Sequence, residues 1–177
     1  MMSNDLPEAA KSFGLRDLLS EQVRDLHDAA LRFRIELEEL RLAAVSPDLV
    51  RLVEEMHLQF SESVSTLEQV CTLLGIPPEG VVCEAMKGLV RECKGSAYEW
   101  DESATRDAAI IANSQRVIHY EIAGYGTAAA FARCLKLGEV DSLLRGLLQT
   151  SIATDSRLTR LAIGSWFSPG INDEAAS

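Results

Sequence analysis

The chain lacks an excess of positive charge. Of its 177 residues, 17 are Lys or Arg and 27 are Asp or Glu, so the formal net charge at pH 7 is −10. No basic segment offsets this charge along the sequence, and such a chain repels phosphate backbones and anionic lipid headgroups. We therefore expect neither a nucleic-acid partner nor a membrane partner.

Long hydrophobic runs and paired cysteines are also missing. No apolar run is long enough to span a bilayer, and the first residues show no basic start followed by an apolar stretch, so we expect a cytoplasmic protein. The four cysteines form no Cys-x-x-Cys pair, which argues against a metal or redox motif. We interpret them as packing or surface residues in a reducing compartment: Cys71, Cys83, Cys93 and Cys134.

Proline and glycine are sparse in long stretches, and no useful run alternates polar with apolar residues, so the sequence predicts an all-α protein. Apolar residues recur in steps of four and three, which lines one face of a helix. Five helices follow from this spacing, at about residues 15–45, 47–74, 83–99, 103–135 and 138–163. Ser46 and Ser103 are expected to cap the helices that follow them, and Gly75 to end the second helix.

Four long helices and one short one predict a four-helix bundle, with the short helix in the connection between the second and third long helices. We expect an N-terminal extension at residues 1–12, the bundle at 13–163 and a C-terminal tail at 164–177. Trp166 and Phe167 could pin that tail against a bundle end or a second subunit.

Gly124 and Gly126 lie inside a helical pattern, without the preceding strand that a phosphate-binding loop needs, so we interpret them as sites of close helix packing.

The apolar spacing places Ala30, Met56, Ile118 and Ser151 on core-facing positions of four different helices. Glu121 lies on a second inward face of the fourth of the five helices. Because an unpaired buried carboxylate is strongly disfavoured, we expect Glu121 to be protonated or hydrogen-bonded. The expected partners are Gln59, Ser114, Tyr120 or Ser151.

Several segments resemble the YciE/YciF-type ferritin-like proteins, which are bacterial stress-associated four-helix bundles. The longest is RDAAIIANSQRVIHYEIAGYGT at 106–127. Shorter ones, in the same order as in the family, are VRDLHDA at 23–29, SPDL at 46–49, CEAMKGL at 83–89 and ATDSRLT at 153–159. The resemblance implies a ferritin-like fold, a homodimer and a two-metal site of carboxylates and histidines that holds iron or manganese.

At the positions that match the family's metal ligands, this chain mostly carries residues that cannot bind a metal. Only Glu121 is kept as a carboxylate. The replaced positions are Ala30, Met56, Gln59, Ile118, Thr150 and Ser151. Clustered carboxylates are costly without a cation, so the loss of the metal favours such replacements. We expect no cofactor and no catalytic residue.

An alternative is a relocated metal site. Glu54 and His57 have the Glu-x-x-His spacing of two-metal bundles, and Glu36 and Glu121 could join them. Against it, Glu54 and His57 lie beside the core positions rather than on them, which is typical of a solvated charged face. His119 is interpreted as a residue at a helix boundary or one hydrogen-bonded beside the site, and His27 as a partly buried packing residue.

The sequence thus favours a metal-free structural or interaction protein, associated with stress, that forms a homodimer and could have a further protein partner. The alternative is a di-iron or di-manganese oxidoreductase, or an iron-handling protein, with the relocated site. A third hypothesis is a small apolar ligand in a cavity left by Ala30.

Overall fold

The computed structural model describes residues 14–101, 103–165 and 168–177. Its helices are α1 (Leu15–Ala43), α2 (Pro47–Leu74), α3 (Glu84–Glu99), α4 (Ala104–Cys134), α5 (Gly138–Ile163) and α6 (Ile171–Ala175). Across these residues the β pairing consists of one isolated bridge, between Ser165 and Ser168. The all-α prediction is confirmed, and the five predicted helices lie within two residues of their predicted bounds.

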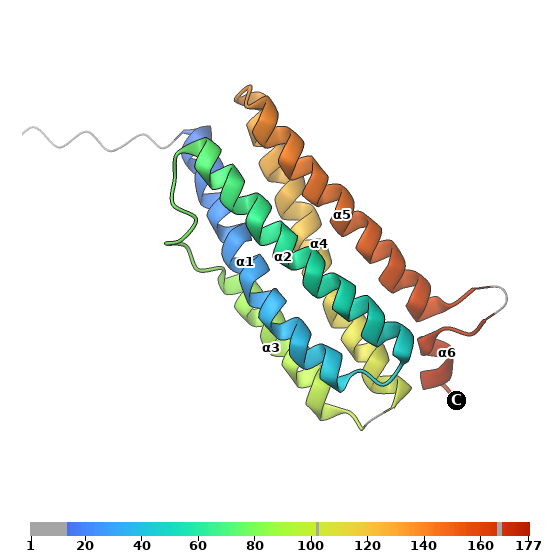
Figure 1. Cartoon of the computed structure of the whole chain (residues 1–177). Coiled ribbons are helices and arrows are strands. Elements are labelled where there is room, and N and C mark those ends of the chain that lie inside the picture. Colours follow the sequence, from blue (N-terminus) through green and yellow to red (C-terminus); the bar gives the residue numbers. More distant parts are fainter. Residues whose placement is uncertain (1–13, 102, 166–167) are drawn as a thin grey trace, which may run out of the picture.

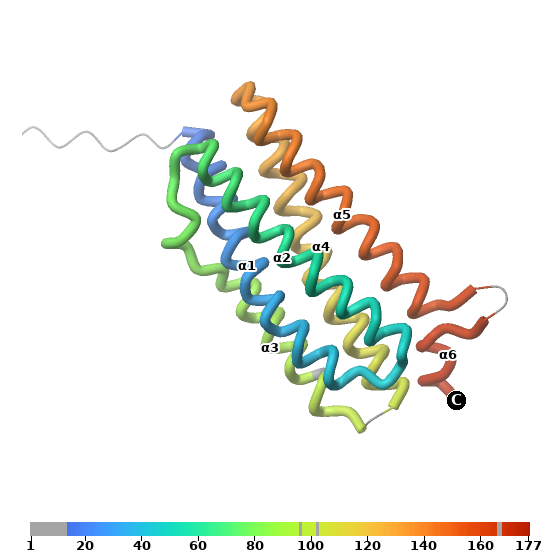
Figure 2. The backbone as a smooth tube through the Cα atoms, viewed as in Figure 1, coloured from blue at the N-terminus to red at the C-terminus, as the bar shows by residue number. Residues whose placement is uncertain are grey.

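The four long helices α1, α2, α4 and α5 form the bundle (Figure 1). α1 packs along α2, α4 packs along α5, and contacts between α1 and α4 and between α2 and α5 close the bundle. α3 contacts α1 and α4 from outside the bundle, and the tube in Figure 2 shows it following the long connection after α2. The short helix therefore occupies the connection in which the sequence predicts it.

The core follows the apolar spacing of the sequence. On α1 and α2, the residues at steps of three and four are almost all buried, and Phe33 meets Phe60 edge to face with 5.0 Å between ring centroids. α4 is buried on a wide face because α1, α3, α5 and α6 all contact it. A helix enclosed on several sides needs apolar or small residues on more than one of its faces, and the sequence of α4 has them on two adjacent faces.

The ends of the helices are determined partly by residues at those ends and partly by residues far away in the sequence. Pro47 begins α2, and Gly75, with φ of 72°, ends it as predicted. Ser46 and Ser103 occupy the N-cap positions as predicted, but neither hydroxyl bonds to the backbone of its helix. Instead, Asp107 of α4 reaches the start of α2, and its carboxylate accepts the backbone N–H groups of Val45 (2.8 Å) and Ser46 (2.7 Å). A residue 61 positions away thus satisfies the N–H of the N-cap residue Ser46, which in a capping box bonds to a side chain of the first helical turn.

Part of the C-terminal segment packs on the bundle. α6 contacts both α4 and α5, and Ile171 is buried at its start. The chain returns to the bundle because Gly164, with φ of 71°, turns it back after α5. Trp166 and Phe167, and residues 1–12, lie outside the described residues.

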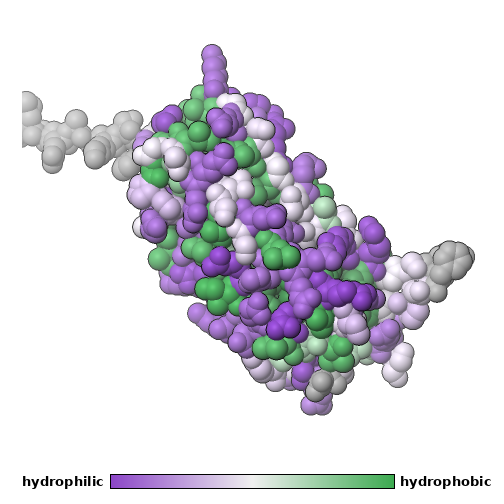
Figure 3. Space-filling view, viewed as in Figure 1, coloured by the Kyte–Doolittle hydropathy of each residue, from purple (hydrophilic) through white to green (hydrophobic). Residues whose placement is uncertain are grey.

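Hydrophilic side chains cover most of the face in Figure 3, with hydrophobic ones scattered among them. No helix within the described ranges is both long and apolar enough to cross a membrane.

Candidate functional site

Glu121 of α4 lies inside the bundle with 1% of its surface exposed. Tyr125, one turn further along α4, donates a hydrogen bond to Oε1 at 2.9 Å. Ser151 of α5 donates to Oε2 at 3.0 Å. Both carboxyl oxygens therefore have a partner. Ser151 is one of the four partners expected from the sequence, whereas Tyr125 is not among them.

Burial is the main influence on the pKa of the Glu121 carboxyl. It raises the pKa of Glu121 to about 7, although the hydrogen bonds from Tyr125 and Ser151 oppose the rise. Burial and the neighbouring Glu121 also raise the pKa of Tyr125 well above its ordinary value. The phenol thus stays protonated and remains a donor at neutral pH.

The other three expected partners of Glu121 make different contacts or none. Gln59 of α2 accepts a hydrogen bond from Thr154 of α5 at 2.5 Å, and this bond links two bundle helices. Tyr120 bonds to Asp25 and Cys83. The buried Ser114 hydroxyl makes no hydrogen bond within the described chain.

The four replaced ligand positions that the apolar spacing places toward the core lie there. Ala30, Met56, Ile118 and Ser151 are buried, one on each long helix. Thr150, however, is exposed and donates to the carbonyl oxygen of Gly146 in its own helix. Since adjacent helical residues point about 100° apart, Ser151 faces the interior and Thr150 cannot.

The four residues of the relocated metal site are not brought together. Glu54 pairs with Arg41 at 3.7 Å and His57 with Glu38 at 3.6 Å, both at the exposed junction of α1 and α2. Glu36 is buried against Lys94 of α3 at 3.5 Å, while Glu121 bonds inside the bundle. Among the described residues, no three His, Cys, Asp or Glu side chains are grouped so that they could hold a metal ion.

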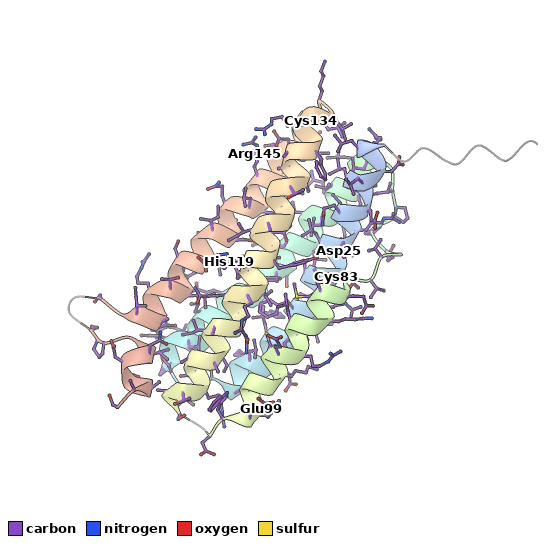
Figure 4. The ribbon with its side chains drawn as sticks, turned by 180° about the vertical axis from the view of Figure 1, so that it is seen from behind. Asp25, Cys83, Glu99, His119, Cys134 and Arg145 are labelled. Atoms are coloured by element: carbon purple, nitrogen blue, oxygen red, sulfur yellow. The ribbon has the colours of Figure 1, made fainter. Side chains whose placement is uncertain are left out.

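The remaining histidines have separate environments. His119 lies in the middle of α4 rather than at a helix boundary (Figure 4). It is mostly exposed and pairs with Asp155 of α5 at 3.3 Å. His27 is buried on α1, with Nε2 3.5 Å from Oε1 of Glu68. Its burial exceeds the partial burial predicted, and its position agrees with a packing role.

A second polar cluster was not identified from the sequence. Tyr120 of α4 donates a hydrogen bond to Asp25 of α1, and the Cys83 sulfur lies 3.0 Å from the same phenol oxygen. Asp25 and Cys83 lie near each other in Figure 4, where α1 meets the start of α3. Asp28 accepts the Cys83 N–H at 2.8 Å, and the Cys83 sulfur accepts the N–H of Met86 at 3.4 Å.

The hydrogen bonds of this cluster connect Cys83, at the start of α3, to α1 and α4. Burial raises the pKa of Cys83 and of Tyr120, so both stay protonated and neither is an activated nucleophile. The signal was present in the sequence: Asp25, Cys83 and Tyr120 each fall in one of the segments that resemble the ferritin-like family. The four cysteines are free; Cys71, Cys83 and Cys93 are buried and Cys134 is exposed.

Comparison with known proteins gives the family. The family model of DUF892, described as a domain of unknown function, matches residues 14–172. The chain belongs to the DUF892 family. This DUF892 chain is 34% identical over 119 residues to Protein YciF of Escherichia coli strain K12, covering 65% of the chain and 72% of YciF.

Two solved structures share the fold of this DUF892 chain. The crystal structure of the E. coli stress protein YciF matches with a TM-score of 0.83 and 29% identity, covering 86% of this chain and 96% of that one. YcfI from Rhodopseudomonas palustris, described as a candidate structural protein, matches with a TM-score of 0.82 and 32% identity. That match covers 88% of this chain and 99% of YcfI.

The residues of this chain do not fit a two-metal centre of the ferritin-like kind. Such a centre needs several carboxylates and histidines from facing helices. At the matching positions Glu121 is the one carboxylate, and Tyr125 and Ser151 already occupy its two oxygens. Ala30, Met56 and Ile118 offer no oxygen or nitrogen ligand from their side chains.

Proposed function

We propose that this DUF892 chain is a non-enzymatic, metal-free ferritin-like protein with a structural or interaction role. The observation that carries the proposal is the state of Glu121, the carboxylate kept at the family's metal position. It is held by a phenol and a hydroxyl in the buried interior of the bundle. A carboxyl with a raised pKa and two donors is stable there without a cation.

The relatives support a stress-associated role and a structural one, since one is named a stress protein and the other is described as a candidate structural protein. The proposal includes a cytoplasmic location, with which four free cysteines agree.

Metal content tests the proposal directly. The chain is produced in medium supplemented with iron and manganese, purified without chelator, and measured by elemental analysis and by metal titration. We expect far less than one tightly held ion per chain. About two ions per chain, the number that a ferritin-like centre holds, would support the di-iron or di-manganese oxidoreductase or iron-handling alternative instead.

Two variants of the buried glutamates locate any metal that is found. E121Q removes the carboxylate at the family position, and E36Q removes the buried carboxylate on α1. We expect neither to change the metal content, because neither group is a ligand. A loss of bound metal confined to E121Q would place a cation in the bundle and overturn the proposal.

A further inference from the structure

A groove between α1 and α3 gathers positive charge on a strongly acidic protein. The two helices lie side by side in Figure 1, and a hollow of about 400 Å³ opens between them. Four cationic side chains line it: Arg32, Lys87, Arg91 and Lys94. We call this hollow the α1–α3 groove.

Helical geometry explains this concentration of charge. Lys87, Arg91 and Lys94 are spaced by four and three residues, so they form one row along α3. Arg32 faces them from α1. The chain as a whole has a net charge of −10, whereas the groove is lined by four cationic side chains and one carboxylate.

Arg91, in the middle of the row, differs from the other three cations in its contacts. Arg32 pairs with Asp28, Lys87 with Glu84 at 2.8 Å, and Lys94 with Glu36 at 3.5 Å. The guanidinium of Arg91, in contrast, forms no hydrogen bond or ion pair with any described residue. An Arg presents a planar set of donors that matches the oxygens of a carboxylate or a phosphate.

The groove also has an apolar wall. Ile35 of α1 is 67% exposed, and Val90 of α3, between Lys87 and Arg91, is half-buried. A hydrocarbon group laid against these two side chains would remove apolar surface from water.

Glu36 is the one carboxylate that lines the groove. Its side chain is 98% buried, and its Oε1 has no hydrogen-bond partner in the described chain. Burial raises the pKa of Glu36, although Lys94 opposes the rise. Because burial disfavours its ionised form, Glu36 offsets less of the groove's positive charge than a solvated carboxylate does.

We propose that the α1–α3 groove binds a small amphipathic anion, a carboxylate or phosphate monoester that carries a short hydrocarbon chain. The anionic head lies on Arg91, between Lys87 and Lys94, and the chain lies on Ile35 and Val90. This site is separate from Glu121 and does not depend on the metal-free reading of the bundle.

Titration calorimetry with the full chain at low ionic strength tests the site. Hexyl phosphate and hexanoate supply the head with the chain, inorganic phosphate supplies the head alone, and hexanol supplies the chain alone. We expect saturable binding of at least one of the two amphipathic anions, and weaker binding of inorganic phosphate and hexanol than of that anion. Equal affinity for hexyl phosphate and inorganic phosphate, or no binding of either amphipathic anion, would overturn the proposal.

Charge variants assign the site to the groove. R91E should weaken binding of the amphipathic anion by about tenfold or more, corresponding to ~1.4 kcal/mol. R133E, at an exposed position near the end of α4, makes the same change in net charge and should leave binding nearly unchanged. E36Q removes a negative charge beside the groove and should strengthen binding. Equal losses in R91E and R133E, or weaker binding in E36Q, would contradict the assignment.

Discussion

At the scale of single residues, the proposal of a metal-free bundle depends on Glu121. Its carboxyl matches a ligand position of the resembling family, and the other matching positions include Ala30 of α1, Met56 of α2 and Ile118 of α4 itself, all of them buried. In the proposed metal-free state, burial favours the neutral carboxyl, and the hydrogen bonds from Tyr125 and Ser151 favour the carboxylate. The residue thereby becomes a source of pH-dependent stability.

The sign of this dependence follows from the pKa of Glu121. In the folded protein it is raised to about 7 from an ordinary value of 4.5. Folding therefore favours the protonated form: the contribution of Glu121 is greatest below pH 4.5 and is lost as the pH rises to 7. We expect the free energy of unfolding, relative to E121Q, to fall between pH 5 and pH 8 by on the order of 3 kcal/mol.

Urea unfolding at several pH values, followed by far-UV circular dichroism, measures this difference. The E121Q variant retains a polar side chain of similar size but does not titrate, so other groups affect both proteins alike. Parallel stability profiles for the two proteins would show that Glu121 does not titrate as inferred.

At the scale of elements, the close approach of α1 and α4 depends on a missing side chain. A Cβ at Gly124 of α4 would lie 2.5 Å from Cδ2 of Leu26, which is buried on α1. The prediction of close packing is confirmed at Gly124. It is wrong at Gly126, because a Cβ there would meet no atom closer than 4.0 Å. Two positions that are two residues apart lie on different faces of a helix, so close packing at Gly124 does not imply close packing at Gly126.

Gly124→Ala and Gly146→Ala should therefore have opposite effects. Gly146 lies in α5 with nothing near its missing Cβ, so alanine should stabilise the fold by about 0.5–1 kcal/mol through helix propensity. At Gly124 the same gain is outweighed because Leu26 must move in a packed core, at a cost of about 1–3 kcal/mol. Denaturant midpoints of both variants check this. A Gly124→Ala variant as stable as Gly146→Ala would mean that Leu26 moves freely.

At the scale of the whole molecule, some helix faces are buried by other helices of the chain, and others leave apolar side chains exposed to solvent. The wide buried face of α4 is covered by other helices of its own chain. In contrast, Leu42 of α1 and Leu58 of α2 are 70% and 66% exposed on the outside of the bundle. A homodimer therefore remains a proposal, supported by the family resemblance and by these exposed apolar side chains rather than by α4.

Light scattering coupled to size-exclusion chromatography tests the dimer. We expect a mass of twice the 19.4 kDa chain at micromolar concentration. L42E and L58E, at the exposed apolar positions, should lower that mass toward one chain while the helical content stays unchanged. A wild-type mass of 19.4 kDa would refute the dimer.

The sequence by itself determined the helices, their lengths and the inward-facing positions of each, because helical periodicity and breakers such as Gly75 act over a few neighbouring residues. It also predicts that most positions matching the family's metal ligands carry residues that cannot bind a metal. The tertiary structure alone decided which side chains meet: Tyr125 beside Glu121, Asp107 at the start of α2, and the row of cations on α3 facing Arg32. Those contacts depend on how far each helix is rotated and shifted against its neighbours, and local spacing does not encode that relation.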